Sequence, residues 1–397
     1  MRSTQPSAMR LKQVIMYGDT PFLPEEIIRN ILKRLPIRSL IRFQCVSKHW
    51  KHLIKTTSFV EEHLRHSNHQ SPTLIFQGRS PTDFSQSHFY LLDNEMQLHE
   101  VQSAPLIDLS WDGWIIGSSN GLLLLSARLN YAHRSMVLWN PASRRVRLVA
   151  KVVNSFLMGF GFSSIVNDYK IVCIRVSDLF VNQVKDYSLN TGQWKEVQFG
   201  NLDGVYIKSQ PFSTNRAIFW FGINLNVEQR DENRHVLVSY DMAIEVFTLI
   251  PLPISAPKSL DSQHTRLTMH ENKLAMLCHT TIGNFESSLI DLWVIEEGTD
   301  PSGGRWSWTK KYSVNHPPWL LPETIWRNEM VCHFVAMPGR SAAGFKVKDD
   351  ERNVVMINLT ANESKMFAIH KYVISPCILN YVESLVPVGN GDCNEEL

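Results

Sequence analysis

The strongest constraint on this chain is a pair of strand patterns that recurs about every 50 residues through most of its length. In one pattern a short apolar stretch follows an asparagine, at residue 120, 167, 215, 272 or 328. Asparagine favours tight turns because it tolerates the left-handed backbone conformation. These stretches are "SNGLLLL" (119–125), "VNDYKIV" (166–172), "TNRAIFWF" (214–221), "ENKLAML" (271–277) and "RNEMVCHF" (327–334).

The second pattern is a hairpin with a polar turn and an aromatic or β-branched second strand. It occurs at residues 89–101, 136–149, 185–197, 237–250 and 355–369, and with an insertion at 289–314. Six units of about four strands each are typical of propeller blades. The fold class is therefore α+β: a small helical N-terminus followed by an all-β, six-unit, propeller-like body. A pair of packed sheets stays open as an alternative because the unit lengths vary.

In a propeller each blade packs between two neighbours, so the large aromatic residues of the strands are expected in the core. Those residues are Trp139, Tyr187, Trp194, Trp220, Tyr240, Phe247 and Trp293.

A different pattern precedes the repeats, in "FLPEEIIRNILKRLPIRSLIRFQCVSKHWKHLI" (22–54). Ile27, Ile28, Ile31, Leu32 and Leu35 recur at helical spacing and predict one wide apolar stripe. We expect Ser39 to cap a second helix with Val46 facing inward, Ser47 to cap a third, and a fourth to run over about 58–64. About 45 residues cannot bury this much apolar surface alone, so part of it should meet either the β body or a partner helix.

The segment resembles an F-box in "LP-x-E" (23–26), "IL-x-RLP" (31–36), "SL" (39–40) and "CVSKHW" (45–50). The resemblance implies binding to the Skp-family adaptor of a cullin–RING ubiquitin ligase. Residues 22–67 carry a formal charge of +5, which suits the acidic adaptor that the F-box family uses. The expected adaptor-binding residues are Leu23, Pro24, Ile28, Ile31, Leu35, Pro36, Cys45, Val46 and Trp50.

The body resembles the plant F-box-associated (type 1) domain, as in S-locus F-box-like and F-box/kelch-type proteins. The matching blocks are "GSSNGLLLL" (117–125), "LWNPASRRVR" (138–147), "GFGFSSIVNDYKIVCI" (159–174), "YSLNTGQW" (187–194) and "VSYDMAIEVFTLIPLP" (238–253). We expect a disordered N-terminus (1–20), the F-box (21–67), the β-repeat domain (72–385) and a disordered tail (386–397).

Composition narrows the function classes. A formal charge of +2 argues against nucleic-acid binding by the whole chain, and no apolar run is long enough to span a membrane. Six scattered cysteines without a CxxC pair fit free thiols in a reducing compartment, so we expect a cytoplasmic or nuclear protein. No P-loop, GxGxxG or HExxH motif is present, and we expect no catalytic residue, metal or cofactor.

The favoured function is therefore a non-catalytic substrate receptor of a Skp–cullin–F-box ubiquitin ligase. A ligase-independent scaffold and a propeller enzyme are the alternatives. The target is not identified; the S-locus resemblance admits a self-incompatibility ribonuclease. Recognition in repeat β domains usually lies on loops, so we expect target binding in the loops at 110–114, 175–183, 224–235, 297–305 and 314–323. Trp111 and Trp319 are the expected anchors there.

Overall fold

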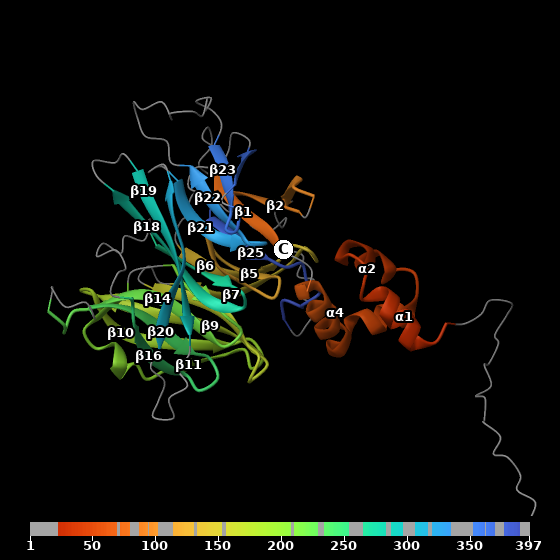
Figure 1. Ribbon diagram of the computed structural model, residues 1–397. Coiled ribbons are helices and arrows are strands. Elements are labelled where there is room, and N and C mark those ends of the chain that lie inside the picture. The colour runs from red at the N-terminus through yellow and green to blue at the C-terminus, as the bar shows by residue number, and fades with distance from the viewer. Residues whose placement is uncertain are drawn as a thin grey trace, which may run out of the picture.

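The structure is a computed structural model, described over part of the chain. The described residues are 23–69, 72–79, 87–93, 95–101, 114–130, 133–152, 156–207, 210–228, 234–253, 265–282, 287–296, 306–316, 320–334, 352–361, 363–369 and 377–389. Within them, four helices form a small domain (residues 23–69, the helical domain) and all the strands form a larger body beside it (Figure 1).

The helices are short and begin close to where the sequence predicts. They are α1 (Glu25–Leu32), α2 (Ile37–Phe43), α3 (Lys48–Lys55) and α4 (Thr57–His69). Ser47 caps α3 as expected, because its hydroxyl accepts a hydrogen bond from the His49 amide at 3.2 Å. The expected cap at Ser39 is wrong: Pro36 precedes α2, and Ser39 lies inside that helix.

The strands form six separate antiparallel sheets, which we call blades 1 to 6. Blade 1 is β25 (Cys377–Tyr381), β1 (Thr73–Arg79), β2 (Ser87–Leu92) and β3 (Leu98–Val101). Blade 2 is β4 (Trp114–Ser119), β5 (Leu122–Asn130), β6 (His133–Asn140) and β7 (Arg145–Val152). Blade 3 is β8 (Phe156–Ser163), β9 (Asp168–Ser177), β10 (Phe180–Ser188) and β11 (Gln193–Glu196).

Blade 4 differs in that its first strand is split into two pieces. It comprises η1 (Gly200–Leu202), β12 (Val205–Ile207), β13 (Phe212–Ser213), β14 (Ala217–Asn224), β15 (His235–Asp241) and β16 (Val246–Pro251), with both β12 and β13 paired to β14. Blade 5 is β17 (Thr265–His270), β18 (Lys273–Ile282), β19 (Ser287–Glu296) and β20 (Ser307–His316). Blade 6 is β21 (Leu320–Trp326), β22 (Glu329–Phe334), β23 (Arg352–Asn358) and β24 (Ser364–Ile369).

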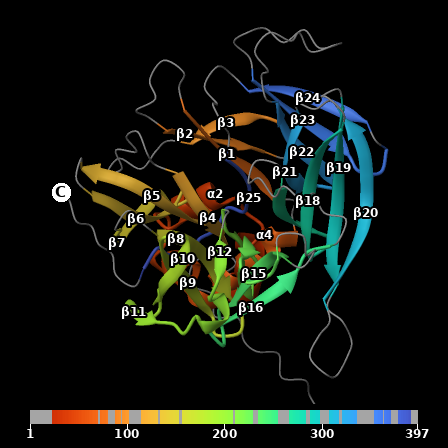
Figure 2. The ribbon, with the colours of Figure 1, turned by 90° about the vertical axis from the view of Figure 1, so that its left-hand side faces the viewer.

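The six sheets are arranged in a ring, with the helical domain behind it in Figure 2. The body is thus a six-bladed β-propeller, and the alternative of two packed sheets is wrong. The ring closes in blade 1, where the C-terminal strand β25 pairs with β1 in the register Thr73↔Tyr381. One blade therefore contains both ends of the propeller sequence.

The core lies mainly between neighbouring blades, and the predicted aromatic residues fill it with one exception. Trp139, Tyr187, Trp220, Tyr240, Phe247 and Trp293 are buried. Trp194 is 37% exposed, so its expected place in the core is wrong. It lies on β11, the outermost strand of blade 3, with its ring 5.1 Å from that of Tyr187. An outer strand has no further strand beside it to cover its side chains.

Polar contacts also join the blades. Arg266 of β17 donates to the buried Glu323 of β21 at 3.0 Å, and His333 lies 2.7 Å from the same carboxylate. Burial raises the pKa of Glu323, but the contacts with His333 and Arg266 outweigh it and leave that pKa lowered. The carboxylate therefore stays charged where blades 5 and 6 meet.

The propeller extends beyond the predicted boundary at residue 385. Val386 and Val388 are buried in the core cluster of blades 2 and 3. The Asn140 side-chain amide donates to the carbonyls of Ser384 and Val386 at 3.0 and 2.8 Å. The expected start of a disordered tail at residue 386 is wrong, because the segment after β25 (382–389) packs against the propeller.

Candidate functional site

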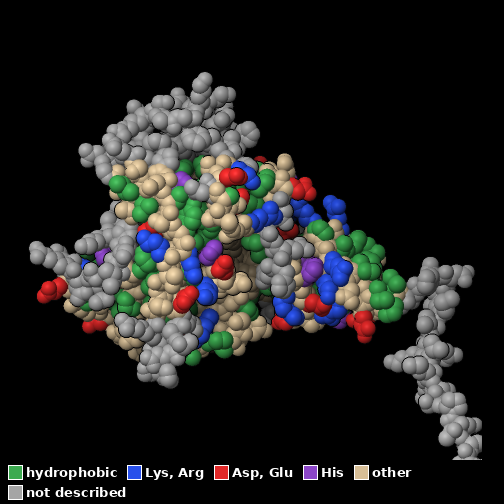
Figure 3. All heavy atoms as spheres, in the orientation of Figure 1, with side chains coloured by type: hydrophobic (Ala, Val, Ile, Leu, Met, Phe, Trp, Pro, Cys, Tyr) green, Lys and Arg blue, Asp and Glu red, His purple; other side chains and the backbone are tan. Residues whose placement is uncertain are grey.

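The helical domain exposes large apolar side chains at its end away from the propeller. Leu23, Ile27, Ile31 and Val46 are between 46% and 67% exposed. We call these four residues the outer apolar surface. Hydrophobic side chains gather at this end of the molecule in Figure 3. Such a cluster on a small domain is typical of a protein–protein contact.

The surface arises because α1 is apolar on two sides. Ile28 and Leu32 face inward and are buried with Leu40, Leu53, Ile54 and Phe59 in the core of the helical domain. Ile27 and Ile31 are one turn apart on another side of the helix and face solvent. The expected wide stripe is therefore divided between the domain core and solvent, and the expected inward position of Val46 is wrong.

The predicted adaptor-binding residues divide in the same way. Leu23, Pro24, Ile31, Pro36, Cys45 and Val46 are exposed, whereas Ile28 is buried. Leu35 and Trp50 are partly buried against the domain core, where the Trp50 ring lies 5.3 Å from that of Phe43. Ile27, which the sequence prediction did not include, is exposed on α1 one turn before Ile31. Adaptor binding by these residues stays a prediction.

The helical domain also carries many basic side chains. Arg29 and Lys33 bind Glu62 at 2.7 and 3.2 Å, and the hydrogen bond from Arg29 is the main reason that the pKa of Glu62 is lowered. Seven other cations of the helical domain are exposed: Arg34, Arg38, Arg42, Lys48, Lys51, Lys55 and Arg65. An acidic partner would meet complementary charge on this domain.

Helix α4 attaches the helical domain to the propeller. Val60 is buried, and Leu64 is partly buried, in the core cluster that blades 2 and 3 share. Leu385, from the segment after β25, packs against both this cluster and the core of the helical domain. Part of the apolar surplus of the helical domain therefore meets the β body, as one of the two sequence alternatives expected, and part remains at the outer apolar surface.

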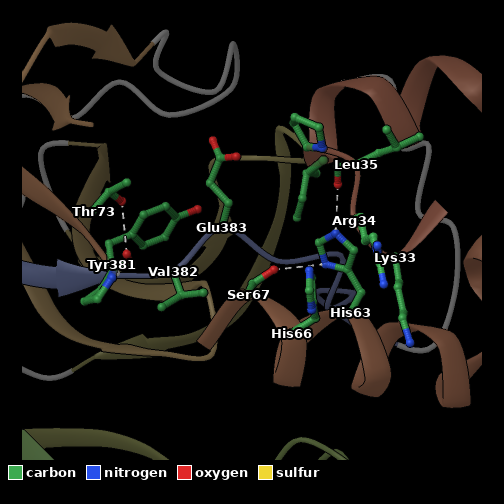
Figure 4. A pocket seen from close by; sticks show the side chains of 13 residues that line it. Lys33, Arg34, Leu35, His63, His66, Ser67, Thr73, Tyr381, Val382 and Glu383 are labelled. Atoms are coloured by element: carbon green, nitrogen blue, oxygen red, sulfur yellow. Dashed lines mark hydrogen bonds between the residues drawn. The ribbon is translucent and has the colours of Figure 1, made fainter. Parts of the chain in front are cut away.

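A pocket of about 200 Å³ marks this junction, and Figure 4 shows how its polar groups are held. His63 of α4 lies between Leu35 and Ser67: its Nε2 donates to the Leu35 carbonyl at 3.1 Å, and its Nδ1 is 3.3 Å from the Ser67 hydroxyl. Burial lowers the pKa of His63. Across the pocket, the Thr73 hydroxyl donates to the Tyr381 carbonyl at 3.0 Å. These contacts tie α4 to the loop after α1 and β1 to β25.

The two expected target anchors, Trp111 and Trp319, lie outside the described residues, and so does the loop at 297–305. The expected loop at 175–183 contains the β9–β10 turn, at Asp178 and Leu179, and the strand topology shows on which face of the propeller this turn lies. The helical domain leads into the start of β1, beside the end of β25. Turns that join the second and third strands of a blade lie at the opposite face. Leu179 and Phe180 are therefore exposed on the face away from the helical domain.

The described residues hold no group of three or more His, Cys, Asp or Glu side chains placed to bind a metal ion. Five cysteines fall within the described ranges, and all five are free thiols: Cys45, Cys173, Cys278, Cys332 and Cys377. In the described part of the chain no helix has the length and apolar character needed to cross a bilayer.

Comparisons with known proteins agree with this division into two parts. Residues 21–62 match the F-box domain, and residues 87–388 match the family described as "F-box associated beta propeller domain". The F-box protein At5g07610 of Arabidopsis thaliana is 26% identical over 321 residues, which cover 76% of this chain and 73% of that protein. The F-box/kelch-repeat protein At3g23880 of the same plant is 24% identical over 329 residues, covering 74% and 79%.

Among solved structures, a chain of a nidogen–laminin complex overlaps with a TM-score of 0.42 at 10% identity, covering 79% of this chain and 99% of that one. An overlap this low carries no argument about function. The assignment rests instead on the matched domains, of which the propeller match alone spans most of the chain. The chain belongs to the family of F-box proteins that carry an F-box-associated β-propeller domain.

Proposed function

We propose that this protein is the substrate-recognition subunit of a Skp–cullin–F-box ubiquitin ligase. Its helical domain binds the Skp-family adaptor through the outer apolar surface, and its propeller binds the protein to be ubiquitinated. The observation that carries the proposal is the outer apolar surface on a helical domain anchored to a propeller by α4.

The physical role is positioning rather than catalysis. A target held on the propeller is brought close to the ubiquitin-transferring subunits, so its effective concentration there rises. The α4 contact supports this role, because a target on a loosely tethered propeller would be held less accurately.

Burial of the outer apolar surface supplies the affinity. Covering one half-exposed Leu or Ile side chain is worth on the order of 1–2 kcal/mol. The exposed cations of the helical domain contribute mainly to the rate of association and to the choice of an acidic partner.

The test is Ile31→Asp, with Ile282→Asp on propeller strand β18 as the matched control. The two side chains are 48% and 45% exposed, so neither substitution disturbs the packing of a buried core. Tagged wild-type protein and tagged Ile282→Asp protein should both recover adaptor and cullin from cells. Tagged Ile31→Asp protein should recover at least about tenfold less of both, because its carboxylate would be buried in an apolar interface without a partner.

If Ile31→Asp recovers as much adaptor as the wild type, the outer apolar surface does not bind the adaptor. Failure of the wild type to recover a cullin would favour the ligase-independent scaffold. Trp50→Ala is a weaker test, because Trp50 packs against the domain core and its loss would also disturb folding.

A further inference from the structure

The β9–β10 hairpin extends beyond the core of blade 3. Ile174 and Val184 are the last buried residues of its two strands, and six of the eight residues at 175–182 are exposed. We call residues 175–182 the hairpin tip. It lies on the propeller face away from the helical domain, so it is separate from the outer apolar surface.

The hairpin tip exposes two large apolar side chains. Leu179 and Phe180 are 57% and 48% exposed. Asp178 and Leu179 form the two-residue turn, with φ of 51° and 71°. Glycine and asparagine are favoured at such left-handed positions, and leucine adopts one only at a cost. An exposed leucine at a costly turn position is not explained by folding and indicates a contact with another molecule.

The two sides of the hairpin tip differ. On one side Val176 and Val181 pair with each other and pack against the core shared by blades 3 and 4. Because side chains alternate along a strand, the pair Ser177 and Phe180 lies on the other side, together with Arg175. Phe180 therefore has only a serine opposite it, and its ring is available to a partner.

The hairpin tip also carries one cation and one anion. Arg175 and Asp178 are exposed, and neither forms an ion pair or a side-chain hydrogen bond with the described residues. Along the hairpin Arg175 is nearer the blade and Asp178 is at the turn, with Phe180 between them. The formal charge of the tip is zero, and its two opposite charges lie at the two ends of an apolar centre.

We propose that the hairpin tip joins two copies of this chain in a symmetric dimer. The two tips lie side by side and point in opposite directions. Arg175 of one copy then binds Asp178 of the other, and the two-fold axis repeats this ion pair. Leu179 and Phe180 of both copies pack between the two ion pairs.

A second copy fits this surface better than other occupants do. A different protein would need a carboxylate and a cation in the matching arrangement, whereas a second copy necessarily carries both. A membrane is disfavoured, because Asp178 would enter the headgroup layer beside Leu179 and a neutral tip gains no attraction to anionic lipid.

The contact is small, and this sets its strength and its use. Two hairpin tips bury less than the roughly 800 Å² per partner of a standard interface, so we expect a dissociation constant on the order of 10 µM. Both helical domains point outward in such a dimer, which leaves both outer apolar surfaces free. A dimer would bind a target with two copies of a recognised segment more tightly than a monomer does.

The first test is sedimentation equilibrium of the purified full chain. We expect a monomer–dimer equilibrium, and Phe180→Asp should weaken dimerisation at least about tenfold. The matched control is Ile244→Asp, on the β15–β16 turn at the opposite face, where the side chain is 67% exposed. The control should dimerise like the wild type.

Charge reversal tests the symmetry itself. Arg175→Asp and Asp178→Arg each place like charges against one another in the dimer, so each should weaken dimerisation about tenfold. The chain with both substitutions restores two opposite-charge pairs, and it should dimerise within about threefold of the wild type. Only a partner that carries the same two substitutions can give this restoration.

The dimer is refuted if the full chain is monomeric about tenfold above the expected dissociation constant, or if the double variant dimerises as weakly as the single ones. Sedimentation of the full chain with phosphatidylserine-containing vesicles, lost in Phe180→Asp, would assign the tip to a membrane and also refute the dimer. Adaptor recovery separates these results from the proposed function, because Phe180→Asp should recover as much adaptor as the wild type.

Discussion

At the scale of single residues, turn conformation explains four of the five repeated asparagines, since Asn215 is not left-handed. Three blades join their first two strands through two successive left-handed residues: Asn120–Gly121, Glu271–Asn272 and Arg327–Asn328. Such turns match the twist of a β-hairpin, and asparagine and glycine adopt them at least cost. Asn167 is also left-handed, with a φ of 49°. The repeat visible in the sequence is therefore a repeat of hairpin geometry.

Gly121 adds a packing requirement to this conformation. A Cβ atom there would lie 2.4 Å from the Ser384 hydroxyl and 2.5 Å from the Val382 carbonyl. Gly192 is also left-handed, with a φ of 67°, but its added Cβ would meet only the Tyr187 hydroxyl, at 3.8 Å. We expect Gly192→Ala to lower the free energy of unfolding by about 1 kcal/mol and Gly121→Ala by about 2 kcal/mol more. Urea unfolding measures the free energy of unfolding of both variants. Equal decreases for the two variants would mean that the segment after β25 does not pack against the turn at Gly121.

At the scale of elements, α4 serves two domains at once. Its Phe59 belongs to the core of the helical domain, while Val60 belongs to the propeller cluster. His63, one turn further on, bonds the carbonyl that follows α1. A helix shared in this way makes the orientation of the helical domain depend on buried contacts rather than on a linker.

The buried His63 makes this junction sensitive to pH. Because burial lowers the pKa of His63, the folded protein binds this proton less readily than the unfolded chain. Its contribution to stability is complete above the unfolded pKa of about 6.5 and is lost as the pH falls below that value. We expect the advantage of the wild type over His63→Gln in free energy of unfolding to shrink between pH 7 and pH 5. His52→Gln, on an exposed position of α3, is the control, and a constant advantage across this range would contradict the prediction.

At the scale of the whole molecule, the C-terminal segment holds the architecture together. Strand β25 closes the ring on β1, and the residues that follow it pack on blades 2 and 3 and on the helical domain. Contacts between residues more than 240 positions apart, such as Asn140 with Val386, complete the closure. Removal of residues from the C-terminal segment should therefore destabilise both the propeller and the helical domain.

Two truncations of the full chain test this closure. A chain that ends at residue 389 keeps the buried Val386 and Val388, and it should melt like the wild type. A chain that ends at residue 385 loses both side chains, which together are worth roughly 3 kcal/mol, and it should melt at a clearly lower temperature. Thermal unfolding followed by circular dichroism measures the difference. Identical melting of the two truncations would place the true boundary at residue 385.

Local patterns in the sequence were enough to predict the parts of the structure that depend on near neighbours. Helical spacing in α1, the cap at Ser47 and the left-handed turns at Asn120 and Asn272 all act within a few residues, so the helical domain and the six-unit repeat could be predicted.

Which apolar residues stay exposed depends on contacts between elements that are far apart in the sequence. Ile28 and Ile31 look alike in the sequence, as do Trp139 and Trp194, and only distant packing buries the first of each pair and exposes the second. The buried contact between Asp186 and Tyr240 likewise joins residues 54 positions apart. Local patterns carry no information about such contacts, because burial depends on which elements the closed ring brings together.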